Sequence, residues 1–136
     1  MIRKIIVFML AAVLCFGAAD SKKKKTEGKP AIEFEQTSWD FGNIPERGGN
    51  VSHDFYFTNT GDAPLVIVTV SASCGCTKPQ FNEKPLAPGK REKVRITYNP
   101  KGRPGEFIKN AYVRTNAPDQ KKVTIKIKGN VIPAAK

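Results

Sequence analysis

Apolar and polar residues alternate along most of this chain, and the alternation predicts short β-strands. Turn-forming glycine, proline, asparagine and aspartate residues separate the alternating segments. No segment shows helical spacing over a useful length. The expected strands cover residues 31–35, 39–44, 51–57, 65–70, 93–98, 107–114 and 123–128.

One of these segments departs from the alternating pattern. Leu65–Val70 is apolar without interruption, which predicts a strand covered on both faces or lying near the centre of a sandwich. The single tryptophan, Trp39, is expected in the core, where a large aromatic ring contributes most packing area.

About seven strands separated by regular turns predict an all-β fold, namely an antiparallel β-sandwich, with a small barrel as the alternative. A chain of 136 residues has room for one hydrophobic core. We therefore expect a single domain at residues 31–132, followed by a short C-terminal tail at residues 133–136.

The N-terminus has the pattern of a signal peptide at residues 1–19. Arg3 and Lys4 precede the apolar run Ile5–Phe16, and small residues up to Ala19 supply a cleavage site. The run is shorter than the ~20 residues of a spanning helix, although an uncleaved anchor is the alternative. We expect export to the periplasm or cell surface, with no transmembrane segment in the mature chain. Cys15 follows the bulky Leu14, which disfavours lipoprotein processing, so Cys15 is expected to be removed with the signal peptide.

The formal net charge of +11 has its densest source just after the expected cleavage site. Residues 20–30 lack apolar periodicity and are expected to form a basic flexible tail carrying Lys22, Lys23, Lys24 and Lys25. For an exported chain, this tail favours an anionic lipid, lipopolysaccharide or cell-wall polymer over nucleic acid. A spacer without a ligand is the alternative.

Two cysteines one residue apart form the least ordinary stretch of the chain. Cys74 and Cys76 follow the apolar strand, and in an exported protein such a pair is oxidised or bound to metal. Gly75 can adopt a positive φ and fold the two sulfurs together, with Thr77 also supporting the turn. A local disulfide staple, a redox pair and a metal clamp all remain open.

Each chemical option for the pair has its own requirement. A disulfide across so small a ring is expected to exchange readily, with Lys78 favouring the thiolate, but no helix N-terminus is expected beside the cysteines. Cu(I) could be held by Cys74 and Cys76 with His53, the single imidazole of the chain. Zinc would need four ligands in a closed site. We expect no cofactor, with copper as the alternative.

Other enzyme chemistry lacks its usual residue groupings. The sequence shows no Ser/His/Asp constellation, phosphate-binding glycine loop or carboxylate pair in an acid–base setting. We therefore assign no catalytic residue and expect a protein that is not an enzyme, with thiol–disulfide exchange as the exception.

Ordered blocks along the chain resemble domain-of-unknown-function family 1573. The blocks are residues 39–44, 57–65, 73–77, 88–89, 98–100 and 129–131. The resemblance implies a seven-stranded Ig-like sandwich related to the hydin and major sperm protein group, exported by bacteria such as the Bacteroidetes. It implies no biochemical activity, although the Ser-Cys-Gly-Cys-Thr block at residues 73–77 is the family's hallmark.

The function we expect is an exported, non-catalytic, Ig-like binding or structural module of the bacterial cell envelope. Its partner, an envelope protein or glycan, would contact the loops or an exposed sheet edge. The alternative is a thiol-based redox or Cu(I)-binding protein that uses Cys74 and Cys76.

Overall fold

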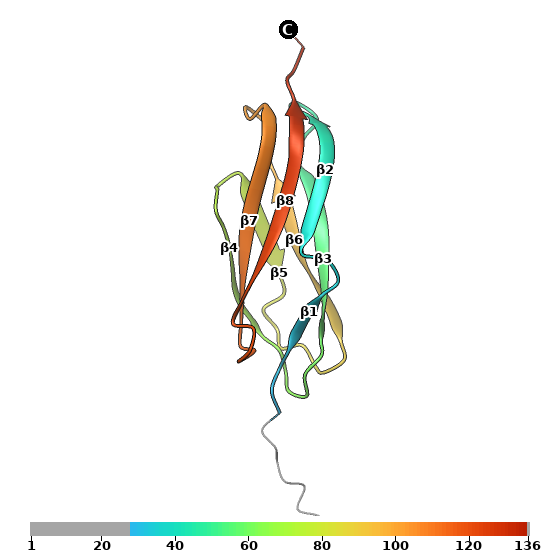
Figure 1. The fold of residues 1–136 in the computed structure, drawn as a ribbon, viewed down its shortest axis with the longest axis vertical. Coiled ribbons are helices and arrows are strands. Elements are labelled where there is room, and N and C mark those ends of the chain that lie inside the picture. The colour runs from blue at the N-terminus through green and yellow to red at the C-terminus, as the bar shows by residue number, and fades with distance from the viewer. Residues whose placement is uncertain (1–27, 136) are drawn as a thin grey trace, which may run out of the picture.

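Two four-stranded β-sheets packed face to face form the domain, which is elongated along its strands (Figure 1). The structure is a computed structural model that describes residues 28–135. The expected signal peptide, Cys15 and Lys22–Lys25 lie outside the described residues.

Eight strands make up the two sheets. Sheet A has the order β1 (Ile32–Phe34), β3 (Val51–Asn59), β6 (Arg91–Tyr98) and β5 (Thr77–Phe81). Sheet B has the order β2 (Ser38–Pro45), β8 (Lys122–Ile132), β7 (Gly105–Thr115) and β4 (Ile67–Ala72). This arrangement confirms the predicted all-β, Ig-like sandwich, with one strand more than expected.

One strand pair is parallel rather than antiparallel. β2 runs parallel to β8, with Trp39 opposite Ile127, whereas every other strand pair of the described residues is antiparallel. The register of this pair shifts between Asp40 and Asn43, where Gly42 has a φ of 69°. Only glycine adopts that backbone conformation without a steric cost, so Gly42 permits the bulge.

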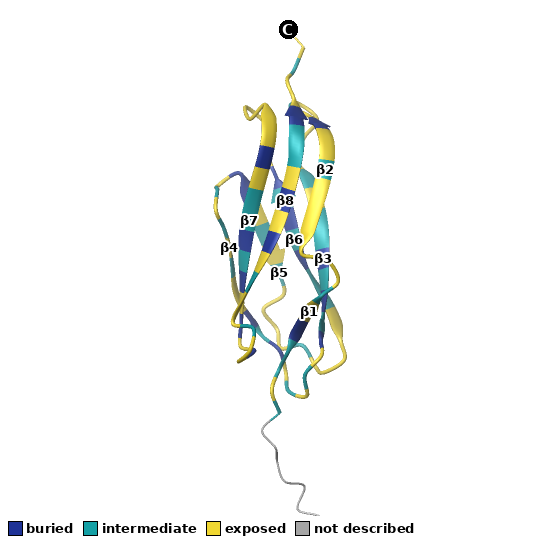
Figure 2. Cartoon of the chain, in the orientation of Figure 1, coloured by how far each residue is buried: buried dark blue, intermediate teal, exposed yellow. Residues whose placement is uncertain are grey.

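The core lies between the sheets and is built from alternate residues of each strand (Figure 2). Tyr98 of sheet A stacks on Phe107 of sheet B, with ring centroids 3.9 Å apart. Opposite Phe107 lies Gly129, where an added Cβ would come within 2.8 Å of the Phe107 ring. Burying one such large apolar side chain contributes about 1.5–3 kcal/mol. The largest fully buried apolar side chains are Ile32, Phe55, Phe57, Leu65, Val94, Ile96, Tyr98, Val113, Ile125, Ile127 and Val131.

A buried asparagine holds the loops at the β1 end of the sandwich. Asn59 donates through Nδ2 to the carbonyl oxygens of Ala63 at 2.8 Å and Leu86 at 2.9 Å. Its Oδ1 accepts from the Gly61 N–H at 3.0 Å. Because a buried amide must be paired, Asn59 specifies the turn that follows β3. This explains the asparagine in the 57–65 block.

Three expectations about individual strands were wrong. The continuous apolar run of residues 65–70 predicted a covered strand, but β4 lies at the edge of sheet B, and a register shift leaves Val68 55% exposed. β5 was not predicted, because Pro79 interrupts its pattern; it is an edge strand, where a proline is tolerated. Trp39 is 36% exposed and lies at the margin of the core.

Candidate functional site

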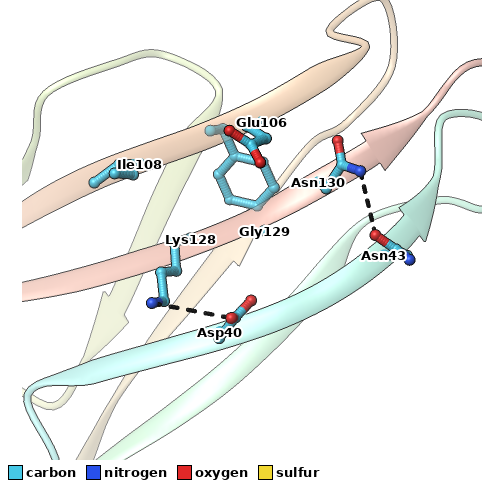
Figure 3. A pocket seen from close by; sticks show the side chains of 8 residues that line it. Asp40, Asn43, Glu106, Ile108, Lys128, Gly129 and Asn130 are labelled. Atoms are coloured by element: carbon cyan, nitrogen blue, oxygen red, sulfur yellow. Dashed lines mark hydrogen bonds and ion pairs between the residues drawn. The ribbon is translucent and has the colours of Figure 1, made fainter.

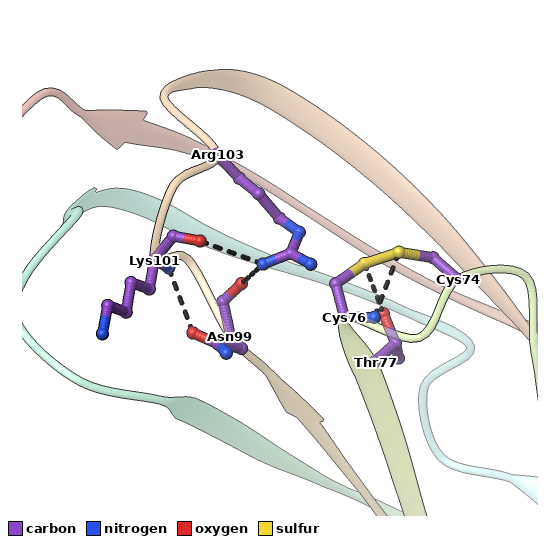
Figure 4. Close-up of a disulfide and its surroundings, with 6 residues drawn as sticks. All are labelled: Cys74, Cys76, Thr77, Asn99, Lys101 and Arg103. Carbon is purple, nitrogen blue, oxygen red and sulfur yellow. Dashed lines mark hydrogen bonds between the residues drawn. A yellow bond between two sulfur atoms is a disulfide. The ribbon is translucent and has the colours of Figure 1, made fainter.

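The cysteine turn connects β4 of sheet B to β5 of sheet A. A disulfide joins Cys74 to Cys76, whose Cα atoms are 5.2 Å apart (Figure 4). The Thr77 N–H donates to the Cys74 carbonyl oxygen at 3.2 Å, and the Cys76 N–H lies 3.1 Å from Cys74 Sγ. The Asn99 N–H donates to the Cys76 carbonyl oxygen at 2.9 Å, which ties the turn to the loop after β6.

Gly75 does not have the positive φ that was expected of it. It is absent from the glycines with positive φ among the described residues, and an added Cβ would meet nothing within 4 Å. The backbone therefore brings the two sulfurs together in a conformation open to other residues. Thr77 does support the turn, through its N–H and through Oγ1, which lies 3.7 Å from Cys76 Sγ.

The two cysteines differ in exposure. Cys76 is buried, with 3% of its surface exposed, whereas Cys74 is only partly buried. Beside the disulfide, Arg103 donates to the carbonyl oxygens of Lys101 at 3.0 Å and Asn99 at 3.4 Å (Figure 4). An attacking thiol would therefore reach Cys74 before Cys76, near a cationic loop.

The copper set proposed from sequence is not assembled. β6 separates β3 from β5, and the register places His53 opposite Ile96, which lies opposite Pro79 rather than beside Cys76. Within residues 28–135 no group of three or more His, Cys, Asp or Glu side chains could hold a metal ion. The structure therefore does not bring His53 together with the two cysteines.

His53 instead packs between the sheets. Its ring stacks on Trp39 at 4.0 Å and contacts the Phe55 ring edge-on at 4.8 Å. Nε2 is buried, and no hydrogen-bond partner for it lies in the described part of the chain. Burial lowers the pKa of His53 below its ordinary 6.5, against a smaller opposite effect of Asp54.

The outer face of sheet A pairs its charges. Arg91 contacts Glu35 at 2.7 Å and stacks over the Tyr56 ring at 3.7 Å. Arg95 donates to both carboxylate oxygens of Asp54, at 2.7 and 3.2 Å, and Lys93 lies 3.5 Å from the same group. The Arg95 hydrogen bond is the main cause that lowers the Asp54 pKa. This face therefore places a carboxylate beside each of these three cations.

The outer face of sheet B leaves most of its cations unpaired. Arg114 and Lys122 lie opposite each other in the β7–β8 register, and Lys126 follows on the same side of β8. Within residues 28–135, none of these three cations has a carboxylate at ion-pair distance. Tyr112 lies beside them, with its ring 5.3 Å from Lys122 Nζ. We call Tyr112, Arg114, Lys122 and Lys126 the basic strip.

A groove of about 610 Å³ continues the same face beyond the basic strip (Figure 3). The side chains of Asp40 and Lys128 lie 4.0 Å apart at one side of the groove, and Asn130 donates to Asn43 Oδ1 at 3.2 Å at the other. Glu106 and the exposed Ile108 project from β7 (Figure 3). Carboxylates, amides and an apolar side chain therefore meet in one depression. The groove residues are Asp40, Asn43, Glu106, Phe107, Ile108, Lys128, Gly129 and Asn130.

β4 is the edge strand with the fewest barriers to a further strand. Its residues, Ile67–Ala72, include no charge and no proline, whereas β5 carries Lys78 and Pro79. The other two edges are blunted, because β1 has 3 residues and β2 contains a bulge and ends at Pro45. In the described chain, no backbone hydrogen bond outside the β7 pairing uses a group of β4.

The orientation of the free groups on β4 follows from the ladder. The Ser73 N–H donates to the Asn110 carbonyl oxygen at 3.1 Å. Because hydrogen-bonded and non-hydrogen-bonded pairs alternate in an antiparallel ladder, Val70 and Ala72 direct their N–H and C=O groups away from β7. These groups face the open edge of sheet B.

Sequence reasoning missed the basic strip and the groove. Lys122, Lys126 and Lys128 share one side of a strand whose other side is apolar, which is also the ordinary pattern of a solvated strand. Their distinguishing feature is that the β7 residues opposite Lys122 and Lys126 are not acidic. This feature can be recognised only when the strand register is known.

The fold and strand order define the class of this protein as an Ig-like β-sandwich. Three solved structures are similar to it. A protein of unknown function from Porphyromonas gingivalis W83 aligns with a TM-score of 0.66 and 18% identity, over 75% of this chain and 47% of that one. The PapD-like domain 7 of human CEP192 aligns at 0.62 and 15%, over 79% and 89%. The E. coli chaperone DraB aligns at 0.53 and 16%, over 78% and 57%.

The family assignment is more specific than the fold. The profile of the family described as "Protein of unknown function (DUF1573)" matches residues 32–131, so this chain belongs to the DUF1573 family. The chain spans about half of the P. gingivalis protein, 47% of its length. None of the curated proteins matches the chain in sequence. Within residues 28–135, no helix is long and apolar enough to span a bilayer.

Proposed function

We propose that this protein is an exported, non-catalytic module of the bacterial cell envelope that binds an extended segment of a partner protein along the free edge of β4. The observation that carries this proposal is the part of the β4 edge from Thr69 to Ala72, which carries no charge or proline and lies beyond the register shift between Ile67 and Thr69. Natural sheets block their edges with charges, prolines or bulges, and an edge left open is a site for an added strand.

The chemistry of β4 fits main-chain recognition. The N–H and C=O groups of Val70 and Ala72 would pair with the partner backbone, and the exposed Thr69 and Ser71 would contact alternate side chains of the added strand. The similarity to a PapD-like domain and to the chaperone DraB supports a binding role, and the signal-peptide pattern of residues 1–19 supports export. The bacterial envelope itself is inferred from that pattern and from the family resemblance.

A photo-crosslinking amino acid at position 69 tests this proposal in cells that export the full chain. We expect a partner crosslink from position 69 and none from position 80, an exposed position on the blocked edge strand β5. Val70→Pro removes one outward N–H from an edge where proline is sterically tolerated, so it should abolish the crosslink.

Val70→Ala is the matched control, because it loses the same packing but keeps the N–H. The crosslink should persist in this variant. Equal crosslinking in the Pro and Ala variants, or from positions 69 and 80 alike, would show that β4 does not take up a strand.

A second function, thiol–disulfide exchange, is favoured by the unequal exposure of the two cysteines. A thiolate of another protein would attack the partly exposed Cys74 Sγ and form a mixed disulfide. The Cys74–Cys76 bond would break, and Cys76 would leave as a thiolate and take up a proton. The neighbouring Arg103 and Lys78 would favour an anionic attacking group.

Single-cysteine variants separate the two functions. If exchange takes place at Cys74, the Cys76→Ser variant should form a mixed disulfide with oxidised glutathione much faster than Cys74→Ser, whose remaining thiol is buried. Equal rates would rule out directed exchange. The Cys74→Ser/Cys76→Ser double variant should keep the position-69 crosslink if strand binding is the function.

A further inference from the structure

We propose that the outer face of sheet B binds an acidic polysaccharide laid along β8. Its anionic groups would lie over the basic strip, and its hydroxyl groups would occupy the groove. This surface is the broad face of the sheet and adjoins the β4 edge, where Thr69 lies opposite Arg114. Its ligand would be a glycan that contacts side chains rather than a strand that pairs with the backbone, so the inference goes beyond the strand-binding function.

Among residues 28–135, the cations of the basic strip have no carboxylate at ion-pair distance. Arg114 and Lys122 are cross-strand neighbours of like charge, and such pairs oppose sheet formation. The other outer face shows that this chain places carboxylates beside its cations, as Asp54 does for Arg95. An anionic ligand would remove the repulsion between Arg114 and Lys122.

The spacing of the cations favours a linear ligand. Lys122 and Lys126 lie four residues apart on one side of β8, or about 13 Å, and Lys128 lies about 7 Å further along. β8 runs along the long axis of the domain (Figure 1). A polymer that follows this strand would meet the cations in succession and then reach the groove.

The groove identifies which polyanion fits. Asp40 and Glu106 present carboxylates there, and Asn43 and Asn130 present amides. Carboxylates accept hydrogen bonds from hydroxyl groups but repel phosphates. Nucleic acid and anionic bilayers carry negative charge along their whole surface, whereas a glycan with uronic acids carries both charged groups and neutral hydroxyls. The mixed chemistry of this face therefore matches the glycan.

Tyr112 adds an apolar contact within the basic strip. It is partly buried and lies between Ser71 and Thr124 in the sheet register, with Lys122 near its ring. A tyrosine ring offers a flat apolar surface with a polar end. The C–H face of a sugar ring can pack on such a surface while the charged substituents reach Arg114 and Lys122.

Binding of the full chain to polygalacturonate, measured by affinity electrophoresis, tests the proposal. The double variant Lys122→Gln/Lys126→Gln should bind about thirtyfold more weakly, which corresponds to the loss of two charge contacts. The matched variant Lys78→Gln/Lys84→Gln changes the net charge equally at exposed positions away from this face and should bind as the parent does. Neutral dextran should not bind.

A groove variant distinguishes glycan recognition from simple charge attraction. Glu106→Ala makes the protein more positive, so attraction alone would tighten binding to every polyanion. We expect it instead to weaken polygalacturonate binding at least about threefold and to tighten binding to double-stranded DNA. Thermal melts of each variant check the fold, and Lys122→Arg/Lys126→Arg should retain binding.

Three outcomes would overturn the proposal. These are the absence of binding to polygalacturonate, an equal loss in the two lysine pairs, and tighter polygalacturonate binding by Glu106→Ala. The last result would identify a general polyanion surface. None of them bears on the position-69 crosslink, so the two proposals fail separately.

Discussion

The two outer faces of the sandwich are both rich in cations, but they differ in how many of these cations have a carboxylate at ion-pair distance. On sheet A, Arg91 and Arg95 each hold a carboxylate, at 2.7 Å in both cases. On sheet B, the one ion pair of the described residues joins Lys128 and Asp40 at 4.0 Å, and the basic strip has none. Since both faces belong to one fold, the fold itself does not require unpaired cations, and this difference is the basis of the proposed glycan site on sheet B.

The largest effect on stability should come from removing a paired carboxylate on the outer face of sheet A. Asp54→Ala removes a carboxylate that is 23% exposed and leaves Arg95 and Lys93 as like-charged neighbours. We expect a loss of about 1 kcal/mol in unfolding free energy, at the upper end for partly exposed pairs.

Asp40→Asn is the corresponding change on sheet B, because it removes the charge that faces Lys128 and keeps the side-chain oxygen that accepts from the Gly42 N–H at 2.8 Å. Asp40 and Lys128 are about half exposed and 4.0 Å apart, so the unfolding free energy should change by less than about 0.5 kcal/mol. Urea titration of both variants makes the measurement. Equal losses would remove the stability difference between the two faces.

Acid should remove the stability that the paired carboxylates of sheet A contribute. Arg95 and Arg91 lower the pKa values of Asp54 and Glu35 below their ordinary values of 3.8 and 4.5. The stability that these groups contribute is present above the unfolded pKa and is lost as the pH falls through the folded pKa. Melting temperatures measured below about pH 5 should therefore fall less steeply in Asp54→Asn than in the parent.

His53 gives a second pH response, from between the sheets. Because its folded pKa lies below 6.5, the unfolded chain takes up a proton first as the pH falls. Stability should therefore decrease as the pH drops through 6.5, and stop decreasing below the folded pKa. His53→Phe keeps the ring stacked on Trp39 without a titrating group, so its melting temperature should stay level in this range. A parent with no slope near pH 6 would contradict the prediction.

The smallest effect should be a gain in stability on sheet B. Lys122→Glu turns the like-charged pair with Arg114 into an opposite-charged one, which should stabilise the fold by about 0.5 kcal/mol. The same change should weaken polygalacturonate binding. A loss of stability in urea titration would contradict the prediction, because it would show that Lys122 stabilises the fold even without a ligand.

Much of the fold could be predicted from the alternating pattern, and the exceptions have local causes. The strand from Val51 and the strand ending at Tyr98 show clear alternation, and both occur in the structure. β5 was missed because Lys78, Pro79 and Gln80 do not alternate. β4 was misplaced because a register shift beside Val68 turns an apolar side chain outward, and a bulge of this kind leaves no mark in the hydrophobic pattern.

The candidate sites were less predictable, because they depend on pairing between distant strands. Cys74 and Cys76 stand out in any reading of the chain, yet the conformation of Gly75 depends on how the turn crosses between the sheets. His53 was considered as a ligand for the cysteines, but β6 lies between them. The pairing of Arg114 with Lys122 appears only once the β7–β8 register is known.

The parallel pairing of β2 with β8 also determines when this domain can finish folding. β2, the first strand of sheet B along the chain, lies beside β8, the last strand. The Lys126 N–H donates to the Thr37 carbonyl oxygen at 2.8 Å. Contacts between such distant segments form late, because a long loop must close first. A chain that emerges from its N-terminus can therefore complete sheet B only after residue 132 has followed.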